Sequence, residues 1–395
     1  MGEHVDKAKG TIKENVGDLT DDERLEREGQ MSQTIGPSGD AGRAVSLRVG
    51  LLGSVFGNPS AMTTHTRGPL SATALALMRG EPADLVAHEV ASSTVAPLVD
   101  DDLQLALFLC YELHYGELDG VDDRAEWNPA LLGFRLELER IFESALREQV
   151  SVHPSSDPVD VQLRALIASD DAPSVSSYLA REGTVEMYRE FLMHRSAYHL
   201  KEADPHSFAI PRLRGRAKAA MVEIQADEYG GGDATWMHSA LFARAMSDLG
   251  LVPTEGRYVP LLPGVTLATV NLMSFFGLHR RLRGAAVGHL AIFEMTSCIP
   301  NRRYGDGLRR LGFGEGATRY FDEHVEADAA HASIAANDMA GSLVDDDPRM
   351  LADVLFGASA LLALDQRWAT RVMDAWREGR DGLWTHPSAP LMSVV

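Results

Sequence analysis

Apolar residues recur at helical spacing along most of the chain between residues 71 and 377. This periodicity predicts many amphipathic helices and almost no strands. The predicted helices cover residues 71–78, 101–115, 129–149, 159–168, 174–181, 184–202, 214–229, 235–249, 266–276, 284–297, 316–337, 348–362 and 365–377. We therefore expect an all-α protein in which the helices bury their apolar faces against one another.

A glycine triplet, Gly230 to Gly232, interrupts this pattern after the predicted helix 214–229. A glycine-rich loop that binds phosphate would follow a strand and would carry a Lys-Ser/Thr pair. The triplet follows a helix and has no such pair, so we reject that interpretation. We expect a kink that joins two helical segments.

The composition restricts the class of partner. The chain has 395 residues, 45% of them hydrophobic, and a formal net charge of −20. Such an acidic surface repels the phosphates of nucleic acids and anionic membranes, so we expect neither as a partner. No basic segment followed by an apolar stretch opens the chain, and the longest weakly polar run, 265–278, is too short to span a bilayer.

Cysteine usage indicates a protein from a reducing compartment. Only Cys110 and Cys298 are present, far apart and without a CxxC pattern. Neither a disulfide framework nor a thiolate zinc site is indicated. We expect a cytoplasmic protein.

The stretch YFDEHVEADAAH, which begins at residue 320, carries the strongest candidate chemistry. On a helix, His324, Asp328 and His331 lie at i, i+4 and i+7 and share one stripe, whereas Glu323 points elsewhere. Two imidazoles and a carboxylate suit iron, manganese or zinc. The alternative is an amphipathic helix whose polar face happens to contain histidines.

Other segments offer further ligands. Glu294 lies in an otherwise apolar helix, where an unpaired carboxylate is costly to bury unless it is paired or binds a metal. Glu228 shares an apolar stripe with Ile224, and His238 follows the glycine kink. A core histidine bonded to a backbone carbonyl is the alternative for His238. Glu202 lies in a helix exit and is the weakest candidate.

The order of Glu228, His238 and Glu294, followed by HVEADAAH, resembles the haem-oxygenase-like diiron oxidases and oxygenases, often described as iron-containing redox enzymes. The resemblance covers about residues 174–377 and implies their seven-helix fold and a pair of Fe²⁺ ions. It also implies a set of metal ligands, namely Glu202, Glu228, His238, Glu294, His324, Asp328 and His331. In this set, Glu202 is the extra carboxylate that some members use to bind iron.

A second resemblance concerns the start of the chain. Residues 7–30, KAKGTIKENVGDLTDDERLEREGQ, resemble the CsbD-like family of small stress-associated proteins. We therefore expect a mobile, charged tail over residues 1–43. The expected organisation continues with an accessory helical domain at 44–173, the diiron domain at 174–380 and a C-terminal tail at 381–395.

The resemblance to the diiron family implies an oxidoreductase that uses O₂ as cosubstrate, an external reductant and a small organic substrate. N-oxygenation, desaturation and C–C cleavage are the reactions expected. We expect a carboxylate such as Glu294 to bridge the two irons, and Tyr229, Asp322 and Glu326 to orient the histidines. A mononuclear or dimanganese site, a non-catalytic helical stress-associated protein and a homodimer are left open.

Overall fold

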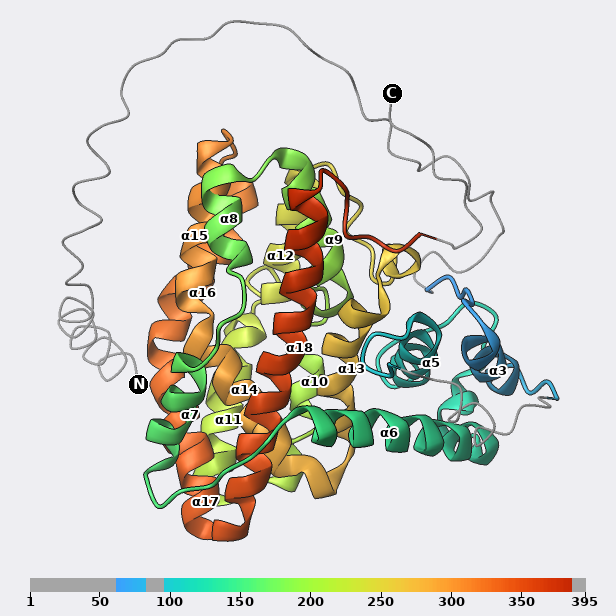
Figure 1. The fold of residues 1–395 in the computed structure, drawn as a ribbon, viewed down its shortest axis with the longest axis horizontal. Coiled ribbons are helices and arrows are strands. Elements are labelled where there is room, and N and C mark those ends of the chain that lie inside the picture. Colours follow the sequence, from blue (N-terminus) through green and yellow to red (C-terminus); the bar gives the residue numbers. More distant parts are fainter. Residues whose placement is uncertain (1–61, 83–95, 386–395) are drawn as a thin grey trace, which may run out of the picture. The chain divides into compact units, whose positions relative to one another are not determined.

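The structure is a computed structural model and describes residues 62–82 and 96–385. Within these residues the regular structure is helical, and extended pairing is limited to one bridge between Met62 and Leu118. Figure 1 shows the helices packed side by side in a bundle. The all-α prediction is confirmed. The CsbD-like segment at 7–30 lies outside the described residues.

Two stretches of the chain supply the helices. Before residue 174 these are α3 (Pro69–Met78), α5 (Asp101–Glu112), α6 (Pro129–Gln149) and α7 (Val159–Ala168). The remaining ones are α8 (Val175–Glu182), α9 (Val185–His199), α10 (Asp204–Ser207), α11 (Gly215–Glu228), α12 (His238–Asp248), α13 (Gly264–Leu278), α14 (Arg283–Thr296), α15 (Cys298–Arg310), α16 (Glu315–Ser333), α17 (Ser342–Asp346) and α18 (Leu351–Arg377).

Side-chain caps explain why several helices begin where the periodicity predicts. The Asp100 side chain accepts hydrogen bonds from two backbone N–H groups at the start of α5, and the Asn128 side chain accepts one at the start of α6, ahead of Pro129. Ser174 caps α8 and Thr184 caps α9 in the same way. Each cap satisfies a backbone donor that has no partner inside the helix.

Three details of the prediction were wrong. The segments predicted as 348–362 and 365–377 form one helix, α18. Helix α15 was not predicted, because its glycines lower the helix propensity. One of them, Gly307, serves packing, since a Cβ there would lie 2.0 Å from the Tyr188 hydroxyl. Helix α16 ends at Ser333 and continues as a π-helix, η6 (Ile334–Gly341).

The crossing of α14 and α18 fixes the middle of the bundle (Figure 1). A Cβ added to Gly288 would lie 1.9 Å from the Val354 carbonyl oxygen, and one added to Gly357 would lie 2.0 Å from the Ala285 carbonyl oxygen. Only glycine permits the two backbones to approach so closely. Glu294 lies about 240° around α14 from Gly288 and therefore belongs to a different face.

The earlier helices pack with the later ones. Residues Pro59–Val395 form one compact unit, in which α5 packs against α13, and α7 packs against η6 and α18. The domain boundary at residue 173 stays a prediction. Among the described residues, no helix combines the length and the apolar character that crossing a bilayer requires.

Candidate metal centre

The glycine triplet brings two ligand-bearing helices together. Gly230, Gly231 and Gly232 all have positive φ, at 65°, 62° and 93°. A Cβ on Gly230 would lie 2.6 Å from the backbone nitrogen of Met237, so the chain turns back tightly at this point. As a result, Nδ1 of His238, the first residue of α12, lies 2.8 Å from Oε2 of Glu228 at the end of α11.

Four buried residues form a first ligand group: Glu202, Glu228, His238 and His324. One ligand atom from each lies within 4.8 Å of the others. Nε2 of His324 is 3.5 Å from Oε1 of Glu202, and the imidazole centroids of His238 and His324 are 4.3 Å apart. The residues come from the turn after α9 and from α11, α12 and α16.

A second buried group consists of Glu228, Glu294 and His331, again with ligand atoms within 4.8 Å of one another. Nδ1 of His331 lies 3.3 Å from Oε2 of Glu294. Glu228 belongs to both groups. Glu228 is therefore the carboxylate that both groups share, whereas Glu294, the example given for a bridging carboxylate, belongs to one group.

Asp328 lies beside the second group. It is buried, its Oδ1 is 3.7 Å from Nδ1 of His331, and its Oδ2 accepts a hydrogen bond from Ser297. Glu323 forms an ion pair with Arg319 instead, as expected for a residue off the ligand stripe. The structure thus brings all seven predicted ligands into one region, with Asp328 outside the two tightest groups.

Several polar atoms in this region make no well-aligned hydrogen bond, namely Oε2 of Glu202, Oε2 of Glu228, Nδ1 of His238 and Nδ1 of His331. Oε2 of Glu228 and Nδ1 of His238 face each other at 2.8 Å, and Nδ1 of His331 lies 3.3 Å from Oε2 of Glu294, so these are charge contacts. A buried polar atom left unsatisfied costs about 1–3 kcal/mol. Each of these atoms belongs to one of the two groups, so a cation bound by the groups would satisfy all of them. The residues present fit a metal pair.

The pKa shifts of the buried carboxylates and histidines also favour a bound cation. Burial raises the pKa of Glu294 to about 7, although His331 opposes the shift. Burial disfavours the charged form of His331, yet the neighbouring carboxylates of Asp227, Asp328 and Glu294 raise its pKa to about 12. Burial acts likewise on His324, but Glu202 raises its pKa well above the usual value. The carboxylates therefore require positive charge, which protons supply in the metal-free protein.

Two acceptors orient the histidines. Nδ1 of His324 lies 2.8 Å from the backbone carbonyl of Tyr320, which leaves Nε2 facing Glu202. Nε2 of His331 lies 3.0 Å from Oδ2 of Asp227, which leaves Nδ1 facing the ligand group. Such hydrogen bonds fix the tautomer of a metal-binding histidine.

The three residues that were expected to orient the ligand histidines either bond other groups or face solvent. The Tyr229 hydroxyl donates to Asp204, Asp322 pairs with Arg309, and Glu326 is exposed. This expectation was wrong because adjacency in sequence does not fix which acceptor a ring nitrogen meets.

A further pair of residues holds Glu202. The hydroxyl of Tyr320 donates to Oε1 of Glu202 at 2.7 Å, and Nδ1 of His199 lies 2.7 Å from the same oxygen. Sequence reasoning missed both. The available signal was spacing, because Tyr320 lies one helical turn before His324 and His199 lies three residues before Glu202.

Comparison with known proteins agrees with this geometry. Residues 189–366 match the family described as iron-containing redox enzyme. All seven candidate ligands lie inside the matched segment. The match supports an oxidoreductase that contains iron.

A curated relative extends the comparison. The chain is 28% identical over 234 residues to a nitrosourea synthase of Streptomyces achromogenes subsp. streptozoticus. The alignment covers 57% of this chain and 50% of the relative. The chain thus spans about half the length of the curated relative it matches.

Proposed function

We propose that the chain is a nonhaem diiron oxidoreductase that uses O₂ to oxidise a small organic substrate. The observation that carries this proposal is the sharing of Glu228 between two buried ligand groups. A shared carboxylate is what two metal ions a few ångströms apart require. The family match to iron-containing redox enzymes supports iron as the metal.

The residues would divide between two ions. Glu202, His238 and His324 would hold one ion, and Glu294, Asp328 and His331 the other, with Glu228 between them. When bound, two ferrous ions supply the electrons that O₂ activation needs. The histidines would bind as neutral ligands, and the carboxylates would offset the charge of the metals.

The protein also contributes orientation and exclusion of water. The Tyr320 carbonyl and Asp227 each take one ring nitrogen of a candidate ligand histidine and thereby direct the other toward Glu202 or Glu294. The Tyr320 hydroxyl and His199 hold Glu202 in place. All seven ligands are buried, so bulk water has little access to them.

Three reaction types were expected, namely N-oxygenation, desaturation and C–C cleavage. The relative is a nitrosourea synthase, and a nitrosourea carries an oxidised nitrogen. This favours oxidation at nitrogen for the present chain. An external reductant would return the irons to the ferrous state.

Iron stoichiometry tests the proposal. Protein prepared without metal under anaerobic conditions should bind about two Fe²⁺ ions per chain and should then consume O₂ when mixed with it. Elemental analysis and electron paramagnetic resonance separate a diiron site from a mononuclear or dimanganese site. Zinc-loaded protein is the control and should consume none. Iron uptake at background level would favour a non-catalytic helical protein.

A further inference from the structure

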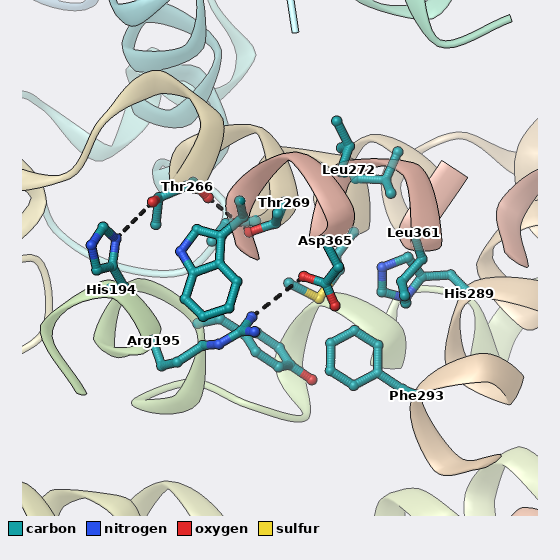
Figure 2. Close-up of a pocket in the computed structure, with 14 residues that line it drawn as sticks. His194, Arg195, Thr266, Thr269, Leu272, His289, Phe293, Leu361 and Asp365 are labelled. Carbon is teal, nitrogen blue, oxygen red and sulfur yellow. Dashed lines mark hydrogen bonds and ion pairs between the residues drawn. The ribbon is translucent and has the colours of Figure 1, made fainter. Parts of the chain in front are cut away.

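Two small cavities lie next to each other in the bundle. The first, here called the metal cavity, has a volume of about 30 Å³ and is lined by Glu202, Glu228, Glu294, His324 and Asp328, among others. The other, here called the second cavity, has a volume of about 20 Å³ and lies between α9, α13, α14 and α18 (Figure 2).

Aromatic rings separate the two cavities. Tyr198 and Phe293 line both, and their ring centroids are 5.7 Å apart. His206 lines the metal cavity, whereas His289 lines the second cavity. The His289 ring stacks on Phe293 at 5.0 Å. The partition is therefore built from four rings, two of which are histidines.

The two histidines are hydrogen-bonded through the partition. Nε2 of His206 lies 3.0 Å from Nδ1 of His289. This bond uses one nitrogen of each ring, so Nδ1 of His206 and Nε2 of His289 remain for the cavities that the rings line. The two imidazoles thus connect the cavities through a line of nitrogen atoms.

Both rings are suited to transfer a proton without carrying a charge. His206 and His289 are buried, and burial lowers the pKa of His206 to about 4 and that of His289 well below its usual value. A neutral imidazole has one nitrogen that donates and one that accepts. Two such rings in series accept a proton at one end as they release another at the opposite end.

The cavities have the size that such a path needs. A volume above about 10–15 Å³ holds one water molecule, and both cavities exceed this. Arg195 and Asp365, which also line the second cavity, form an ion pair at 3.6 Å with side chains 19% and 36% exposed. Solvent reaches this part of the lining, where water would enter the cavity.

We propose that His206 and His289 form a proton relay from the second cavity to the metal cavity. This inference rests on the proposed function, since reduction of O₂ consumes protons. A proton from water in the second cavity adds to Nε2 of His289, and the Nδ1 proton of His289 passes to Nε2 of His206. His206 then releases its Nδ1 proton into the metal cavity. One proton moves, no electron is transferred, and the reverse tautomer shift resets both rings.

A purely structural pair would behave differently. Two buried histidines that only satisfy each other need the hydrogen bond and nothing more. Glutamine preserves that bond, because its amide donates and accepts, but an amide does not shuttle protons at neutral pH. The His289→Gln variant therefore separates the two roles.

The first experiment uses the iron-loaded enzyme. His289→Gln should bind iron as wild type does, yet consume O₂ at least about 100-fold more slowly, in line with the usual contribution of proton transfer. It should also show a larger solvent deuterium isotope effect, and added imidazole should restore the rate of His289→Ala. His194→Gln is the matched control, because His194 lines the same cavity on the opposite side and bonds Thr266 (Figure 2). Wild-type rates in His289→Gln would overturn the relay.

The second experiment does not depend on activity. In ¹⁵N-histidine NMR spectra of the zinc-loaded protein, the relay predicts that the shared proton between His206 and His289 exchanges with D₂O within seconds despite full burial. The exchange rate of the proton in the hydrogen bond between His194 and Thr266, which lies outside the relay, is the reference. A shared proton protected for hours would overturn the relay, whatever the outcome for O₂ consumption, whereas rapid exchange without iron-dependent activity would leave the relay intact and reject the proposed function.

Discussion

Oε2 of Glu228 lies 2.8 Å from Nδ1 of His238, although the two residues belong to different helices and a glycine triplet separates them. The same glutamate also belongs to the group that contains Glu294 and His331. Glu228 is therefore the point at which the two halves of the candidate centre meet. Substitutions there should affect both halves at once.

Glu228→Ala should reduce the iron content from about two ions per chain to a small fraction of one, because both sites lose a ligand. Glu294→Ala should remove chiefly one ion, since Glu294 belongs to a single group. Iron is measured by elemental analysis after anaerobic loading. Glu223→Ala is the control, as Glu223 is an exposed residue of the same helix. Equal losses in all three variants would contradict the shared-ligand arrangement.

Asp328→Ala should lower the affinity for the second ion by more than about 10–100-fold, the usual loss for a residue that only orients a ligand, because it removes a ligand carboxylate beside His331. Titration of metal-free protein with Fe²⁺ gives the two affinities. Glu323→Ala, on the same helix but paired with Arg319, should leave both affinities unchanged. An identical effect of the two substitutions would reject the assignment of ligands to one helix stripe.

Gly230→Ala should weaken metal binding and stability together. At φ 65° a non-glycine residue is strained by about 1–3 kcal/mol, and the added Cβ would also meet the Met237 nitrogen at 2.6 Å. Gly231→Ala, at φ 62° with open space around it, should show the strain without the displacement of His238. Thermal unfolding and iron content measure the two effects. Normal iron content in Gly230→Ala would show that the tight turn does not position His238.

Metal binding should release protons. At pH 7 the metal-free protein keeps His331 protonated, because its pKa is raised to about 12, and His324 as well, whose pKa is raised well above its usual value. Both must deprotonate to bind a metal, so metal affinity should rise with pH above 7. Zinc titrations by calorimetry in buffers of different ionisation enthalpy give the number of protons. His331→Ala should release about one proton fewer, and the same number as wild type would contradict the raised pKa.

The same shifts predict how the metal-free protein responds to pH. The folded pKa of His331 lies above the value of about 6.5 in the unfolded chain. Its contribution to the free energy of unfolding is therefore complete below pH 6.5 and declines as pH rises toward 12. Urea unfolding of chelator-treated protein between pH 7 and 9 should show this decline. In His331→Ala the slope should be smaller, and an unchanged slope would reject the shift.

Periodicity predicted most of the fold because helix starts depend on local signals. Asn128 with Pro129 marks the start of α6 in the sequence alone, and the structure places it there. Helix α15 was missed because Gly307 is a poor helix former. The reason for a glycine at this position is the close packing of Tyr188, which only the folded structure shows. The π-helix η6 had no recognised signal.

The ligand set was accessible from the sequence because residue types, order and spacing survive without coordinates. The role of each ligand was not. Glu294 was the example given for a bridging carboxylate, yet the distances favour Glu228, since only the folded chain shows which carboxylate lies between two histidine groups. The hydrogen bond between His206 and His289 joins residues 83 positions apart, so local sequence patterns could not predict it.

The most direct test of the central claim is a crystal structure of the protein loaded anaerobically with Fe²⁺, with anomalous scattering recorded at the iron edge. We expect two iron peaks about 3.5–4 Å apart, one beside His238 and His324 and the other beside His331, with the Glu228 carboxylate in contact with both. A single peak, or two peaks of which only one contacts Glu228, would contradict the central claim.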